Sequence, residues 1–163
     1  MAAPENTLIT RAEVTSITDA TTGRKALVLD GATLELVDTG IRDLSGLFTA
    51  GNVASGRVLV QRTGRTVTWT LVSLNLAGSV ASVWSILANT AGRFDGFKPT
   101  YTAAATLMQS EAEYARIMVN GSGSVDIHYG AAGVNYVGTI TYTTTAPWPT
   151  TLPGVADGQP VGV

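Results

Sequence analysis

A two-residue alternation of apolar and polar side chains runs through most of this chain from residue 56 onward. The clearest example is the segment 65–76, in which Val67, Trp69 and Leu71 alternate with threonines. Side chains two residues apart point to the same face of a β-strand, so one face of this segment is apolar and the other is polar. The segment is therefore predicted to be a half-buried strand with Trp69 in the core.

Further short apolar runs are separated by turns that contain glycine. The predicted strands cover residues 26–29, 33–37, 57–61, 65–76, 80–87, 101–108, 113–119, 124–129 and 135–144. Asp30 and Gly31 suit a type I′ hairpin turn, and Gly64 can adopt the positive φ of a tight hairpin. Val83 and Ile86 are out of phase, which indicates a bulge. Helical periodicity of useful length is absent, so we expect an all-β fold, a β-sandwich of the jelly-roll type.

The first residues differ in composition from this region. Residues 1–22 are polar and rich in threonine, and we expect them to form an arm that becomes ordered only against a partner. A short amphipathic helix over residues 11–18 is the alternative, because Val14 and Ile17 are three residues apart.

These patterns divide the chain into two parts. Residues 1–40 are predicted to form the N-terminal arm and a hairpin, and residues 41–163 the β-sandwich head. At the start of the head, residues 41–55 mix apolar side chains with glycine. We expect them to be a connector in which Leu44, Leu47 and Phe48 plug the base of the sandwich.

The composition excludes several classes of protein. Charged residues make up 13% of the chain, against about 25% in an ordinary soluble domain, so we expect other copies or another protein to cover apolar surface. The net charge is −2 and the basic residues are scattered, which argues against nucleic-acid binding. The absence of cysteine excludes disulfides and thiolate metal sites. No apolar run approaches the roughly 18 residues of a membrane span, so we expect no membrane insertion.

Two groups of loop residues are candidates for ligand binding. Saccharide sites combine an aromatic face with hydrogen-bonding side chains, and loops on a rigid sandwich present such groups. The first group lies in the turn-rich loop 89–100 and the second near the turn at 131–133; their members are Arg93, Phe94, Asp95 and Phe97, and His128, Tyr129, Asn135 and Tyr136. The competing interpretation is that these loops cap the core or pack against a neighbouring chain.

Trp148 stands between two prolines, which restrict the segment to extended geometry. We expect its ring to cover the end of the sandwich or a contact between subunits. Stacking on a sugar is the alternative role.

Catalytic groupings are sparse. Asp126 and His128 share a strand face, but the chain has no Gly-x-Ser-x-Gly elbow to supply a nucleophile. Glu111 and Glu113 also share a face, and we expect them to form a solvated rim rather than the acid pair of a glycosidase. The prediction is a protein that is not an enzyme and uses no cofactor or metal.

Five segments of this sequence resemble one family of phage proteins. They are DTGIR at 38–42, RVLVQRTGRTVTW at 57–69, GRFDGFKP at 92–99, VNGSGSV at 119–125 and WPTTLPG at 148–154. The order of these motifs is similar to that of the receptor-binding or tail-fibre tip domains of minor tail proteins, from tailed bacteriophages of actinobacteria. The last motif is the most specific of them.

The resemblance implies a homotrimeric β-sandwich head on a virion that binds a host cell-surface saccharide during adsorption. It implies that the protein is made in the host cytoplasm and displayed on the outside of the particle, where the N-terminal arm contacts other virion proteins. The alternative is a capsid decoration or head-fibre protein with the same β domain, since the sequence does not separate tail from capsid placement.

Overall fold

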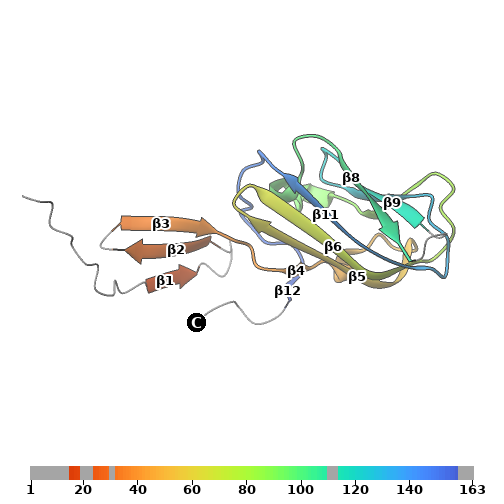
Figure 1. Cartoon of the computed structure of the whole chain (residues 1–163), viewed down its shortest axis with the longest axis horizontal. Helices are drawn as coiled ribbons and strands as arrows, with labels where there is room; N and C mark the ends of the chain where they lie inside the picture. Colours follow the sequence, from red (N-terminus) through yellow and green to blue (C-terminus); the bar gives the residue numbers. More distant parts are fainter. Residues whose placement is uncertain (1–14, 19–23, 30–31, 110–113, 158–163) are drawn as a thin grey trace, which may run out of the picture.

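The computed structural model describes residues 15–18, 24–29, 32–109 and 114–157 (Figure 1). The strands are β1 Thr15–Thr18, β2 Arg24–Leu29, β3 Ala32–Val37, β4 Arg42–Asp43, β5 Val53–Thr63, β6 Thr66–Leu76, β7 Val83–Leu87, β8 Ala103–Met108, β9 Tyr114–Val119, β10 Val125–His128, β11 Asn135–Thr143 and β12 Val155–Ala156. Short 3₁₀ helices lie at η1 Ser45–Leu47, η2 Thr90–Gly92 and η3 Asp95–Phe97. The predicted all-β class is confirmed. Within the described ranges, no helix has the length and hydrophobicity needed to cross a bilayer.

Strands β1, β2 and β3 form a separate antiparallel sheet, which stands beside the larger body in Figure 1. The pairing of Leu29 with Ala32 confirms the predicted hairpin between β2 and β3. The alternative of a helix over 11–18 is wrong for Thr15–Thr18, which pair with β2 as a strand. Threonine and isoleucine favour an extended backbone, and β2 supplies the hydrogen-bonding partner.

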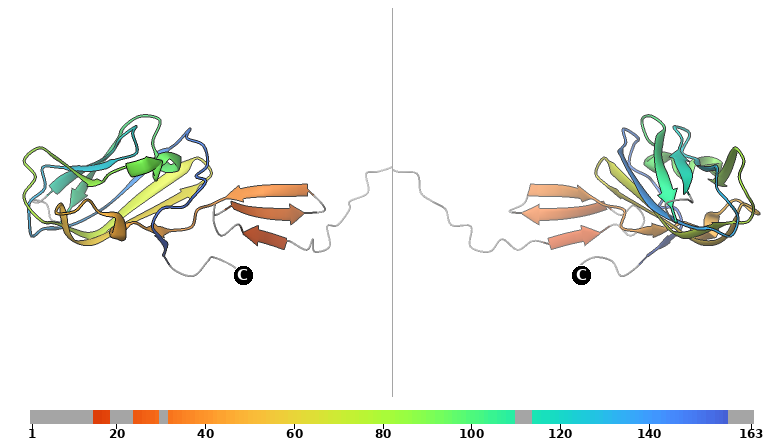
Figure 2. Two further views of the ribbon diagram at one scale, coloured as in Figure 1. Left: turned by 180° about the vertical axis from the view of Figure 1, so that it is seen from behind. Right: turned by 45° about the vertical axis from the view of Figure 1, so that its right-hand side comes forward.

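The other nine strands form one antiparallel sheet in the order β12-β4-β5-β6-β11-β8-β9-β10-β7. The sheet curls so that β5 and β6 lie on one side of the core and β8 and β9 on the other (Figures 1 and 2). The segment that follows β4 reaches the edge strand β7, where Thr49 N donates to Ile86 O at 2.9 Å. Asn52 Nδ2 also donates to Ser85 O at 2.8 Å. The jelly-roll sandwich remains a prediction within this curled all-β architecture.

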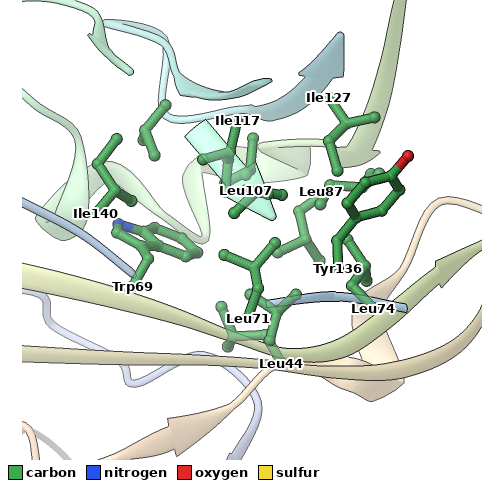
Figure 3. Packing of buried hydrophobic residues seen from close by; sticks show 14 of the residues in the cluster. Leu44, Trp69, Leu71, Leu74, Leu87, Leu107, Ile117, Ile127, Tyr136 and Ile140 are labelled. Atoms are coloured by element: carbon green, nitrogen blue, oxygen red, sulfur yellow. The ribbon is translucent and has the colours of Figure 1, made fainter. Parts of the chain in front are cut away.

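The core fills the inside of the curled sheet, as Figure 3 shows. Val67, Trp69 and Leu71 are buried as their alternation predicts, and Leu44 in the predicted connector is buried as well. Full burial of a valine or leucine side chain stabilises the fold by roughly 1.5–3 kcal/mol relative to leaving it exposed. The apolar face of β6 thus holds the two sides of the sheet together.

Two irregularities interrupt the ladders. In β7 the register with β10 skips Ile86, which confirms the predicted bulge. Between β5 and β6 the register shifts on both sides of Ser55, and Ser73 in the opposite strand has a φ of +48°. Gly56 lies at this shift with a φ of +109°, and the β6 backbone approaches it closely.

We expect Gly56→Ala to destabilise the body strongly. The new Cβ would lie 2.5 Å from Ser73 O and 2.6 Å from Leu74 Cα, in a backbone conformation that other residues rarely adopt. The free energy of unfolding should fall by about 3 kcal/mol or more, as measured by urea denaturation.

Gly64→Ala is the matched control, because Gly64 has a φ of +57° but no atom within 4 Å of its added Cβ. Its expected loss is only about 1 kcal/mol. Equal losses for the two variants would contradict the close approach of β5 and β6.

Candidate ligand-binding surface

The aromatic residues of loop 89–100 belong to the core. Phe94 and Phe97 are completely buried, and the Phe94 ring packs edge-on against Trp69 with the ring centroids 6.0 Å apart. This corrects their prediction as ligand-binding residues, because a buried ring offers no face to a saccharide. Burial of two large apolar rings is the physical reason that the loop folds inward.

Arg93 and Asp95, the polar members of the same group, have different partners. Arg93 donates to Ala88 O at 2.7 Å and lies over the Phe94 ring at 4.9 Å, so its guanidinium is engaged within the loop. Asp95 is exposed and accepts a hydrogen bond from Asn89 Nδ2 at 2.9 Å. The four predicted residues therefore do not form a joint binding surface.

A buried arginine that the sequence analysis did not select holds this loop in place. Arg62 lies at the end of β5, and its guanidinium is 4.8 Å from the centre of the Trp148 ring. It donates hydrogen bonds to the main-chain carbonyl oxygens of Gly64 (2.9 Å), Gly96, Ala146 (3.0 Å) and Pro147 (2.9 Å). Burial lowers the pKa of Arg62 below its ordinary value. The Trp148 ring covers this guanidinium at the end of the body. Covering the end of the sandwich was one of the two structural roles predicted for this ring.

A second polar link joins the loop to the core. Trp69 Nε1 donates to Tyr142 Oη at 2.7 Å, and Tyr142 Oη donates in turn to Phe97 O. Burial raises the pKa of Tyr142 well above its ordinary value of 10.0. The loop is thus fixed by hydrogen bonds as well as by its aromatic rings.

The second predicted group is divided between core and surface. Tyr136 is buried, and its hydroxyl accepts a hydrogen bond from Ala131 N at 2.8 Å, so its prediction as a ligand contact is also corrected. Asn135 is exposed, but its Oδ1 accepts from Asn75 Nδ2 at 3.1 Å. His128 and Tyr129 remain together at the end of β10, with ring centroids 6.0 Å apart and the planes tilted by 49°.

His128 belongs to a row of residues that crosses four strands on the outer face of the sheet. Arg116 on β9 is the direct partner of His128 and also of Thr106 on β8, and Val83 on β7 is the partner of His128 on the other side. Arg116 was not selected from the sequence. The alternation in β9 could have indicated it, because its neighbours Ala115 and Ile117 are buried.

A second row on the same face is apolar. Val137 pairs with Met108, and Met108 pairs with Tyr114. Their exposed fractions are 49%, 49% and 62%, respectively. The outer face therefore carries an apolar row beside the first row, which is polar except for Val83 and is called the polar row below.

Tyr129 is in an unusual backbone conformation. Its φ is +59°, in the left-handed region where residues other than glycine, asparagine and aspartate are uncommon. Its side chain is nevertheless 63% exposed, so core packing does not hold the ring. Strained residues of this kind gather at functional sites more often than elsewhere.

One of the three candidate acids lies in the described part of the chain. Asp126 shares the face of His128 and accepts a hydrogen bond from Asn120 Nδ2. Glu111 and Glu113 lie outside the described residues. Among the residues that are described, no group of three acidic, histidine or cysteine side chains is arranged to hold a metal ion.

No protein-family model matches the chain. The search of curated proteins likewise gives no match. The likeness to phage tail proteins therefore remains a prediction from the motifs.

Replacing Tyr142 by phenylalanine should reduce the alkaline sensitivity of the fold. The folded-state pKa of Tyr142 lies above its unfolded value, so the stability that its neutral form contributes is present below pH 10 and is lost as the pH rises above that value. Urea unfolding at pH 8 and pH 11 should show a smaller loss of free energy on going to pH 11 for Tyr142→Phe than for the native protein.

The variant should also lose about 1–3 kcal/mol at pH 8, because Phe97 O and Trp69 Nε1 lose their partner. Other groups that titrate in alkali are the same in both proteins. An identical pH dependence in the two would contradict the burial of this hydroxyl.

Proposed function

We propose that this chain is a structural protein of a bacteriophage virion, a minor tail or tail-fibre tip protein that binds a host cell-surface saccharide during adsorption. The motifs at residues 38–154 support the phage assignment. The observation that carries the binding role is the exposure of Tyr101 and Tyr129, at 84% and 63%. Exposed aromatic rings on a rigid body offer flat apolar faces on which sugar rings stack.

The binding would be multivalent. We propose a homotrimer in which the apolar row of Val137, Met108 and Tyr114 contacts another copy, since exposed apolar patches mark contact surfaces. Three weak sites acting in parallel, repeated over several spikes, give high avidity without covalent chemistry. The N-terminal region would attach the head to other virion proteins on the exterior of the particle.

A charge in the apolar row should weaken self-association. The mass in solution, measured by light scattering, is expected to be that of a trimer for the native protein and smaller for Met108→Lys, because burying an unpaired ammonium costs several kcal/mol. Thr66→Lys is the control, since Thr66 is exposed at the start of β6 outside this row. A native monomer, or an equal effect of both substitutions, would contradict the proposed contact.

Binding to host cells tests the function directly. A fluorescent fusion of the full chain should label intact cells of at least one strain in a panel of actinobacteria, and cell-wall polysaccharide purified from that strain should compete for the binding. Labelled antibody should locate the protein at the tail of the virion by electron microscopy. If no strain in the panel is labelled, or if the protein is located on the capsid, the proposed role in adsorption is overturned.

A further inference from the structure

The polar row on the outer face contains a positive charge, on Arg116, that has no ionic partner within the described part of the chain. Arg116 is exposed, and within the described residues it has neither an ion pair nor a hydrogen bond from its side chain. Its direct cross-strand partner is His128, whose ring contacts Tyr129. Directly opposite residues of an antiparallel pair have Cβ atoms about 4.5–5.5 Å apart, so the guanidinium and the imidazole can reach the same ligand.

The backbone at Tyr129 supplies an independent observation. A glycine or an asparagine would adopt a φ of +59° with less strain than tyrosine, and no core contact requires the aromatic ring. The ring stands exposed next to His128, at the end of the strand that carries the polar row. A costly conformation that presents an exposed ring is expected where the ring contacts a ligand.

We propose that the face formed by Arg116, His128 and Tyr129 binds a saccharide that carries a carboxylate or phosphate group. The guanidinium fork of Arg116 pairs with the anionic group, His128 hydrogen-bonds next to it, and the Tyr129 ring stacks on a sugar ring. This inference rests on the proposed function and names the site and the charge of the ligand.

The neighbours of this face define where the anion lies. Asp126 is two residues before His128 on the same strand face, and Asn120 Nδ2 donates a hydrogen bond to it. Its negative charge disfavours an anion at that end of β10. Thr106, the partner of Arg116 on the other side, is uncharged and exposed. The anionic group therefore sits over Arg116, which lies between His128 and Thr106, on the side of this row away from Asp126.

Calorimetric titration of the full-length protein tests the site with three probes. These are a uronic acid oligosaccharide, a sugar polymer linked by phosphodiesters, and a neutral glucan as control. We expect one of the two anionic probes to bind and the glucan not to bind. Binding of the uronic acid oligosaccharide would identify a carboxylate as the recognised group, and binding of the phosphodiester polymer would identify a phosphate. The affinity should fall as salt is added.

Two variants separate the contribution of each side chain. Arg116→Gln should weaken binding of the anionic probe by about tenfold or more, since a charge-assisted pair is lost. Tyr129→Asn should weaken it to a similar degree while its melting temperature stays equal or rises, because asparagine tolerates the left-handed backbone. Arg65→Gln is the matched control: Arg65 is also exposed, but it lies at the β5–β6 turn and should leave binding unchanged.

The outcomes distinguish this site from the function on which it rests. If the fusion labels cells but Arg116→Gln and Tyr129→Asn bind as the native protein does, this site is overturned and the adsorption role survives. If the anionic probe binds at this face but no strain is labelled, the site is supported and the adsorption role fails. Equal binding of the neutral glucan, or an equal loss with Arg65→Gln, would overturn the proposed charge recognition.

Discussion

A buried guanidinium with only neutral partners is the interaction on which the architecture depends. Arg62 lies at the end of β5 and donates hydrogen bonds to carbonyl oxygens of two segments that are distant in the sequence. These segments are the loop at Gly96 and the residues after β11, Ala146 and Pro147. A charged group is tolerated out of water only where its hydrogen-bond donors have acceptors. If either segment moved away, the guanidinium and the carbonyl oxygens would lose these partners. The same contact seats the Trp148 ring and keeps Phe97 in the core.

The sequence predicted those parts of the fold that local periodicity controls. Alternation in the segment 65–76 placed Trp69 inside, and glycine between apolar runs placed the hairpins. The burial of Phe94 and Phe97 was not predicted, because a turn-rich loop has no period that marks an inner face. Their inward position depends on Trp69 and on hydrogen bonds to Arg62 and Tyr142, which come from distant strands.

In the candidate site too, some residues could be selected from the sequence and others could not. Tyr129 and His128 were selected from the sequence because aromatic and polar side chains were expected at turns. Arg116 was missed, although the alternation of β9 marks it as outward, because its importance depends on the register that places it opposite His128. Tyr136 was assigned to the ligand, yet it shares a strand face with Ile140, and that phase already indicated the core. Register is a property of the pairing between strands, and no pattern within one strand reports it.

The hydrogen bonds from Thr49 and Asn52 to β7 have a consequence for how two copies of this chain can meet. An unpaired strand edge is a template on which a neighbouring chain can add a strand, and crowding favours such growth into fibrils. Here β7, one of the two edge strands of the large sheet, is bonded at Ser85 and Ile86 by the chain's own connector. The addition of a strand from another chain is therefore blocked at these positions of β7.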